Sequence, residues 1–186
     1  AVFKNPIVNG LTVTTTGQSV GGIVGYLDAV DTRIEKPQLS DITLTIQNRY
    51  VGGVAGYSDA TKLNISNATV SGLDLYSSGG TQTQCYAAGI LGYPHAGEST
   101  ITDAKVSNAV ITGAKSYVGG ITGTFGGTAT TLKNCVVGSK CSIQGSYSVG
   151  GISGGAFLTA GHKMIIDNCI AYCDVTGSST QVGGIM

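Results

Sequence analysis

The hexapeptide Val118-Gly119-Gly120-Ile121-Thr122-Gly123 recurs along the whole chain of 186 residues. Its copies are Val20–Gly25, Val51–Gly56, Ala87–Gly92, Val118–Gly123, Val149–Gly154 and the partial Val182–Ile185. The starts of successive copies lie 31, 36, 31, 31 and 33 residues apart. Such a regular period is typical of a repeat architecture, in which each repeat forms one supersecondary unit.

The residues between the copies alternate in polarity, as in Ala104–Val106 and Val110–Thr112. Alternation with period two indicates β-strands, and no segment has the 3.6-residue period of a helix. A unit of 31 residues is too short for a four-stranded propeller blade. We therefore expect an all-β fold in which residues 1–186 form a single solenoid repeat domain. We expect this solenoid to be a right-handed parallel β-solenoid (β-helix) of about six coils, with roughly 31 residues and about three strands per coil.

An Asn or Asp precedes one strand of every repeat. These residues are Asn5, Asp41, Asn67, Asp103, Asn134 and Asn168. They suit a corner, because Asn and Asp tolerate the left-handed backbone conformation and bond the turn backbone. The steps to the next hexapeptide are 15, 10, 20, 15, 15 and 14 residues. On this alignment the second coil is about five residues short, and the third has about five extra in Ser77–Gln84.

The glycine pair of the hexapeptide predicts a second structural feature. Glycine allows either a turn with positive φ or a close approach of two backbones. Valine at Gly119 is therefore expected to damage the coil. The motif glycines are Gly21, Gly22, Gly52, Gly53, Gly89, Gly119, Gly120, Gly150 and Gly151.

Composition excludes several classes of function. Ten basic and ten acidic residues give no net charge, which argues against nucleic-acid binding and against a basic membrane-binding patch. No apolar run is long enough to insert into a membrane. The chain lacks a signal peptide and ends inside the sixth hexapeptide, so we expect it to be a piece of a longer protein.

No catalytic motif is present. The two histidines, His95 and His162, have no neighbouring Glu, so the His-Glu-x-x-His motif of metallopeptidases is absent. The glycine-rich stretches belong to the repeat and do not form a phosphate-binding loop. We expect this segment to be no enzyme and to need no cofactor.

Five cysteines occur, at Cys85, Cys135, Cys141, Cys169 and Cys173. Cys135 and Cys169 occupy the repeat position of Ala68 and Ala104, which predicts a column of small, unlinked core residues. The spacings do not match a zinc site.

Six of the nine tyrosines flank the hexapeptide. Tyr50, Tyr86 and Tyr117 immediately precede it, whereas Tyr26, Tyr57 and Tyr93 immediately follow it. Strand alternation predicts that the first three rings point outward and form an exposed strip that binds a host glycan or protein. The alternative is a ladder that stabilises the solenoid through its own ring stacking.

Asp28, Asp59 and His95 share one position, three residues after the hexapeptide. On consecutive coils they are weak candidates for a metal site or an acid–base pair. The alternative is that they are solvated loop residues, and we expect no bound metal.

The iterated Val-Gly-Gly-Ile-x-Gly motif resembles the GLUG-motif repeats of bacterial surface proteins, including adhesin-like proteins and the repeat region of IgA-specific metallopeptidases. The resemblance covers essentially the whole chain, although the third copy has Ala88 in place of the first glycine. It implies an extracellular β-solenoid module, at the cell surface or secreted. It implies no catalytic residue in this chain, even where the parent protein has a separate peptidase domain.

The expected function is therefore that of a non-enzymatic adhesion platform or structural stalk. One alternative is a carbohydrate-active β-helix enzyme, similar to polysaccharide lyases and hydrolases, that uses Asp28 and Asp59. Another is a self-assembling filament subunit, because strand edges at a coil end favour end-to-end association.

Overall fold

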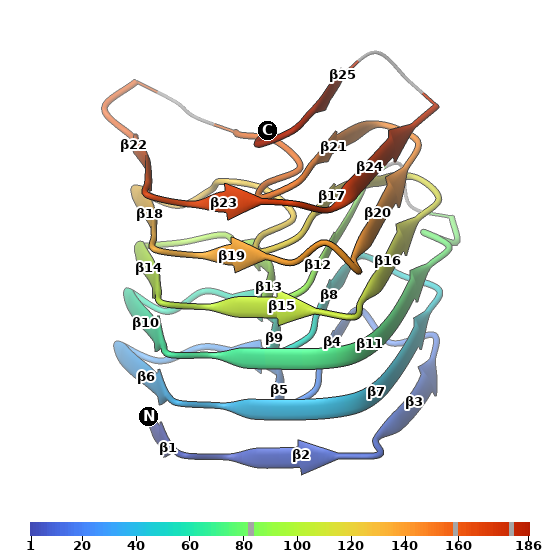
Figure 1. Cartoon of the computed structure of the whole chain (residues 1–186). Coiled ribbons are helices and arrows are strands. Elements are labelled where there is room, and N and C mark those ends of the chain that lie inside the picture. Colours follow the sequence, from blue (N-terminus) through green and yellow to red (C-terminus); the bar gives the residue numbers. More distant parts are fainter. Residues whose placement is uncertain (82–83, 158–159, 179–180) are drawn as a thin grey trace.

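The computed structural model describes residues 1–81, 84–157, 160–178 and 181–186. Within these ranges the chain has no helix and winds into a right-handed β-solenoid of about six coils, with the N-terminus in the first coil and the C-terminus in the last (Figure 1). Every described strand pairs in parallel with the equivalent strand of a neighbouring coil. The all-β solenoid expected from the sequence is confirmed.

Four sheets run along the solenoid. The first contains β1 (Val2–Lys4), β6 (Asp31–Glu35), β10 (Lys62–Ser66), β14 (Glu98–Thr102), β18 (Ala129–Lys133) and β22 (Lys163–Asp167). The second contains β2 (Ile7–Asn9), β3 (Thr12–Thr15), β7 (Gln38–Ile46), β11 (Thr69–Ser77), β15 (Lys105–Ser107), β16 (Val110–Gly113), β19 (Val136–Val137), β20 (Ser142–Gly145), β23 (Ile170–Ala171) and β24 (Asp174–Gly177).

The hexapeptides build the other two sheets. The third sheet contains β4 (Ser19–Gly21), β8 (Tyr50–Gly52), β12 (Cys85–Ala88), β17 (Ser116–Gly119), β21 (Ser148–Gly150) and β25 (Gln181–Gly183). The fourth contains β5 (Val24–Leu27), β9 (Ala55–Ser58) and β13 (Leu91–Pro94), and isolated bridges continue it at Thr122, Ser153 and Ala156. The first coil thus has five strands, β1 to β5, where the sequence predicted about three.

The corner residues correct one part of the predicted register. The column after the first sheet consists of residues with φ between 50° and 55°: Asn5, Lys36, Asn67, Asp103, Asn134 and Asn168. Asp41 is not in this column. It has φ of 55° and lies at a second corner with Gly10, Gly72 and Asn108. The second coil is therefore not short, because Lys36 lies 15 residues before Val51.

Amide side chains connect successive coils at the first corner. Asn134 donates from Nδ2 to Asp103 Oδ1 at 3.0 Å, and Asn168 donates from Nδ2 to Asn134 Oδ1 at 2.9 Å. The longer third coil turns at Gly79 and Gly80, both with positive φ. Residues 82 and 83 of its predicted insertion lie outside the described residues.

The hexapeptide glycines turn the chain through close packing. None of them has positive φ, so the explanation that these glycines allow a turn with positive φ is wrong. A Cβ on Gly119 would lie only 2.1 Å from the carbonyl oxygen of Thr122, and one on Gly52 would lie 2.1 Å from that of Ala55. The backbone folds back on itself so tightly that no side chain fits there.

The interior contains aligned apolar columns, which are largely inaccessible to solvent. One column contains Ile34, Ile65, Ile101 and Leu132, and another contains Val51, Ala87, Val118 and Val149.

The five cysteines are free thiols. Cys135 is buried, and its backbone nitrogen lies 3.4 Å from Cys169 Sγ. Within the described ranges no helix has the length and hydropathy to cross a membrane.

Candidate binding site

The hexapeptide brings the two tyrosine columns into contact. A Cβ on Gly25 would lie 2.7 Å from the Ser19 carbonyl oxygen, so the fourth sheet packs backbone against backbone on the third. Tyrosines before and after the reversal therefore meet on the outside of the solenoid. The ring centroids of Tyr50 and Tyr57 are 4.5 Å apart, and those of Tyr86 and Tyr93 are 4.4 Å apart.

Rings also stack from coil to coil. Tyr50 and Tyr86 have centroids 5.5 Å apart at an interplanar angle of 14°, and Tyr86 and Tyr117 have centroids 5.4 Å apart at 11°. Tyr26 and Tyr57 stack at 5.4 Å and 17°. The parallel strand register produces this spacing, because equivalent residues lie directly over one another. The tyrosines that flank the hexapeptide form one continuous structure, which we call the aromatic column.

The expected strip of three exposed rings is absent. Tyr86 and Tyr117 are only 6% and 7% exposed, because rings from the opposite side of the reversal cover them. Tyr93 covers Tyr86, and Phe157 lies 4.8 Å from Tyr117. Strand alternation correctly directs these rings away from the core, but the folded-back strand shields them from solvent. For Tyr86 and Tyr117 the structure thus favours the self-stacking ladder that the sequence left open.

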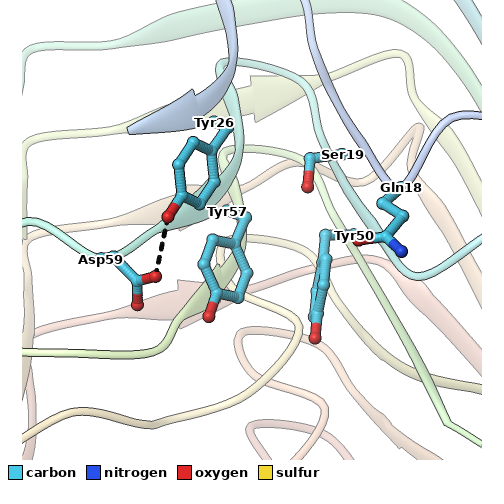
Figure 2. Close-up of a pocket in the computed structure, with 6 residues that line it drawn as sticks. All are labelled: Gln18, Ser19, Tyr26, Tyr50, Tyr57 and Asp59. Carbon is cyan, nitrogen blue, oxygen red and sulfur yellow. Dashed lines mark hydrogen bonds between the residues drawn. The ribbon is translucent and has the colours of Figure 1, made fainter. Parts of the chain in front are cut away.

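The aromatic column is open at its first-coil end. Ser19 pairs in register with Tyr50, so the first coil has a serine at the position where the next three coils have a tyrosine. A pocket of about 420 Å³ lies here, lined by Gln18, Ser19, Tyr26, Tyr50, Tyr57 and Asp59. Figure 2 shows Tyr26 above Tyr57, with Ser19 and Tyr50 on one side of these two rings and Asp59 on the other.

Asp59 is the charged group of this pocket. Its Oδ2 accepts a hydrogen bond from the Tyr26 hydroxyl at 3.0 Å, and its Oδ1 lies 2.6 Å from His95 Nδ1. Burial acts to raise the pKa of the Asp59 carboxyl, but the bonds from His95 and Tyr26 outweigh it and hold the pKa below its ordinary value. Asp59 is therefore anionic at neutral pH.

The predicted metal and acid–base candidates meet only in part. Asp59 and His95 are in contact. The pKa of Tyr26 is raised, mainly by the hydrogen bond from Tyr26 to Asp59, then by burial and by the charge of Asp59. The charge of Asp28 is the smallest of these causes, which places Asp28 near Tyr26. Among the described residues, no three His, Cys, Asp or Glu side chains cluster as metal ligands would. A general acid needs a raised carboxyl pKa, whereas the pKa of the Asp59 carboxyl is lowered, so Asp59 is poorly suited to the acid role.

Three of the residues that complete this region were not found from the sequence. Gln18 and Ser19 line the pocket, and Phe157 covers the far end of the aromatic column. Ser19 could have been found, because it immediately precedes the first hexapeptide, as Tyr50 precedes the second. Phe157 lies three residues after the fifth hexapeptide, at the repeat position of Asp28, Asp59 and His95, but its aromatic residue type does not match theirs.

Alkaline pH is expected to unfold the protein through the aromatic column. Burial first, and then Tyr147, raises the pKa of Tyr117 to about 12, from 10.0 in the unfolded chain. Burial likewise raises the pKa of Tyr86. When the pKa of a tyrosine is higher in the folded state than in the unfolded state, the fold gains stability that is fully present below the unfolded-state pKa. This stability is lost as the pH rises from the unfolded-state pKa through the folded-state pKa. The free energy of unfolding is therefore expected to fall from about pH 10.

This expectation can be measured by urea unfolding at several pH values, with tyrosinate absorbance at 295 nm recorded in parallel. The Tyr117→Phe variant is the control, since it should lose less stability between pH 10 and 12 than the parent. Ionisation of all nine tyrosines near pH 10, with no loss of stability, would contradict the burial of these hydroxyls.

The fold and the site together define a β-solenoid with an aromatic column and an open pocket at the first-coil end of that column. Comparison of the chain with family models, with curated proteins and with solved structures gives no match.

Proposed function

We propose that this chain is a non-enzymatic adhesion module of an extracellular bacterial protein, at the cell surface or secreted, which binds its ligand at the open end of the aromatic column. The resemblance of the repeated hexapeptide to GLUG motifs supports the extracellular, surface-associated setting. The observation that carries the binding role is the pocket at Ser19, where the stack of tyrosines stops and leaves aromatic surface facing solvent.

Physical chemistry supports recognition at this place rather than elsewhere on the surface. Tyr26 is 51% exposed, and Tyr50 and Tyr57 are half-buried. Tyrosines held by stacking lose little further entropy on binding, and they combine an apolar face with a polar hydroxyl. With charged residues at only 11% of the chain, a long-range charge pattern contributes little, so contact at the pocket decides the partner.

A binding screen tests this proposal. The purified chain is applied to arrays of host glycans and extracellular matrix proteins, together with the Tyr26→Ser variant. The matched control is Tyr172→Ser, because Tyr172 is 63% exposed and does not line the pocket. We expect retention on at least one glycan or protein, a loss of at least tenfold for Tyr26→Ser, and no change for Tyr172→Ser.

Two outcomes would contradict the proposed function. One is that the parent chain is retained on no glycan and no protein of the arrays. The other is that Tyr26→Ser and Tyr172→Ser are retained as strongly as the parent, which would move the binding surface away from the pocket.

A further inference from the structure

The open end of the aromatic column leaves room for one more ring. Ser19, Tyr50, Tyr86, Tyr117 and Ser148 occupy the same position on successive coils. At the far end, Phe157 packs against Tyr117. At the near end, the described rings that stack on Tyr50 come from the third coil, Tyr86 at 14° and Tyr93 at 18°. No ring of the first coil stacks there, and the pocket occupies this place.

The lining combines aromatic faces with hydrogen-bonding groups at both ends. Tyr50 offers a ring face, with Tyr57 tilted at 51° beside it. Gln18 and Ser19 lie at one end, and Asp59 lies at the other beyond Tyr26 and Tyr57 (Figure 2). The volume of about 420 Å³ is within the usual range for small-molecule sites. A suitable ligand has an apolar face and polar groups around its rim.

We propose that this pocket binds a neutral pyranose residue of a glycan, which stacks on Tyr50 as an additional ring of the aromatic column. This inference rests on the proposed function and names the chemical class of its ligand. The C–H face of the sugar lies on the tyrosine rings, as other apolar surfaces do. Its rim hydroxyls bond Gln18 and Ser19 at one end and Asp59 at the other.

The charge of the pocket selects neutral over acidic sugars. Asp59 is anionic, and Asp28 adds a second negative charge close enough to act on Tyr26. Tyr26 and His95 engage the Asp59 carboxylate, but a carboxylate has about four acceptor positions, which leaves capacity for a sugar hydroxyl. A uronic or sialic acid would place its carboxylate against these charges and is disfavoured.

The arrangement fits a sugar better than an organic cation. A cation site surrounds one positive centre with ring faces and a nearby carboxylate. Here Tyr26 and Tyr57 stack on each other at 17°, and Asp59 lies on the opposite side of them from Tyr50 (Figure 2). A cation site needs the carboxylate and the ring faces around one centre, whereas the rim hydroxyls of a sugar can use lining groups on both sides of the pocket.

Saturation-transfer NMR with defined small ligands tests the inference. The probes are methyl β-D-glucopyranoside, methyl β-D-galactopyranoside, glucuronic acid and tetramethylammonium. We expect the parent to bind at least one methyl pyranoside and to bind neither glucuronic acid nor tetramethylammonium. Binding of tetramethylammonium alone would overturn the proposal and identify a cation site.

The decisive variant is Ser19→Tyr, which places the chain's own ring in the empty position. We expect at least a tenfold loss of pyranoside affinity with an unchanged or higher melting temperature. Thr14→Tyr is the matched control, because Thr14 is exposed and lies outside the pocket. Thr14 belongs to the second sheet, where it pairs with Thr45. The control variant should bind as the parent does. Equal pyranoside binding by Ser19→Tyr and the parent would overturn the inference.

Asp59→Asn provides a second, independent measurement. It keeps the shape of the side chain and removes its charge, so pyranoside binding should persist while discrimination against glucuronic acid falls at least threefold. If neither methyl pyranoside binds the parent, the inference is wrong. In that case, Tyr26-dependent retention of a protein in the array screen would still support the proposed adhesion function, so the two failures are distinguishable.

Discussion

The Gly119→Val variant is expected to unfold at a temperature at least about 10 °C below the parent, through a loss of about 4 kcal/mol or more. A Cβ at this position would lie 2.1 Å from the Thr122 carbonyl oxygen and 2.8 Å from the Gly154 backbone nitrogen. Both neighbours are backbone atoms held in the solenoid, so neither can move aside as a side chain would. Circular dichroism during heating and in urea measures the effect.

The control is Gly184→Val in the last hexapeptide, because a Cβ there meets no atom within 4 Å. It should melt within a few degrees of the parent. Gly119→Ala should lose nearly as much stability as Gly119→Val, since the Cβ itself makes the contact. If Gly119→Val and Gly184→Val melted alike, backbone packing would not be the reason for the glycine at this position.

The repeat made the architecture predictable. Each copy of the hexapeptide reverses the direction of the chain in the same way. The period of the copies was therefore enough to predict the number of coils and their parallel pairing, without any knowledge of distant contacts. The reason for the glycines was only half predictable. Sequence shows that Gly119 cannot be replaced freely, but positive φ and close packing both select glycine, and only coordinates distinguish them.

The register of the second coil was not predictable from residue types. Lys36 has a φ of 51°, a conformation in which Asn, Asp and Gly are usual and Lys is uncommon. Asp41, five residues later, matched the corner pattern and lies at the other corner. Parallel pairing to Asn5 and Asn67 places Lys36 in the left-handed conformation. Tertiary context thus overrides the local preference.

The tyrosine positions were predictable, whereas their burial was not. Strand alternation gave the correct side of the sheet for Tyr50, Tyr86 and Tyr117. The burial depends on how sharply the chain reverses within each hexapeptide, as between Gly52 and Ala55, because these reversals set Tyr57 against Tyr50 and Tyr93 against Tyr86. A serine at one position then turns a continuous stack into a pocket, which becomes visible only once the coils are in register.

The Tyr86→Ala variant is expected to lose about 3–5 kcal/mol of unfolding free energy, the usual range for removal of a large buried aromatic side chain. Tyr86 is 6% exposed, and its ring stacks on Tyr93 at 4.4 Å, on Tyr117 at 5.4 Å and on Tyr50 at 5.5 Å. Truncation opens a cavity in the middle of the aromatic column, because the neighbouring rings are fixed by their own strands and cannot close it.

Tyr86→Phe separates the contribution of the ring from that of the hydroxyl. The hydroxyl donates to Gln84 Oε1 at 3.2 Å, so its removal should lower stability by only about 1 kcal/mol. Tyr172→Ala, at a residue 63% exposed, should change stability by no more than about 0.5 kcal/mol. Urea unfolding of the three variants ranks them. If Tyr86→Ala proved no more destabilising than Tyr172→Ala, the aromatic column would not stabilise the solenoid, and its stacking would have to be explained by ligand binding alone.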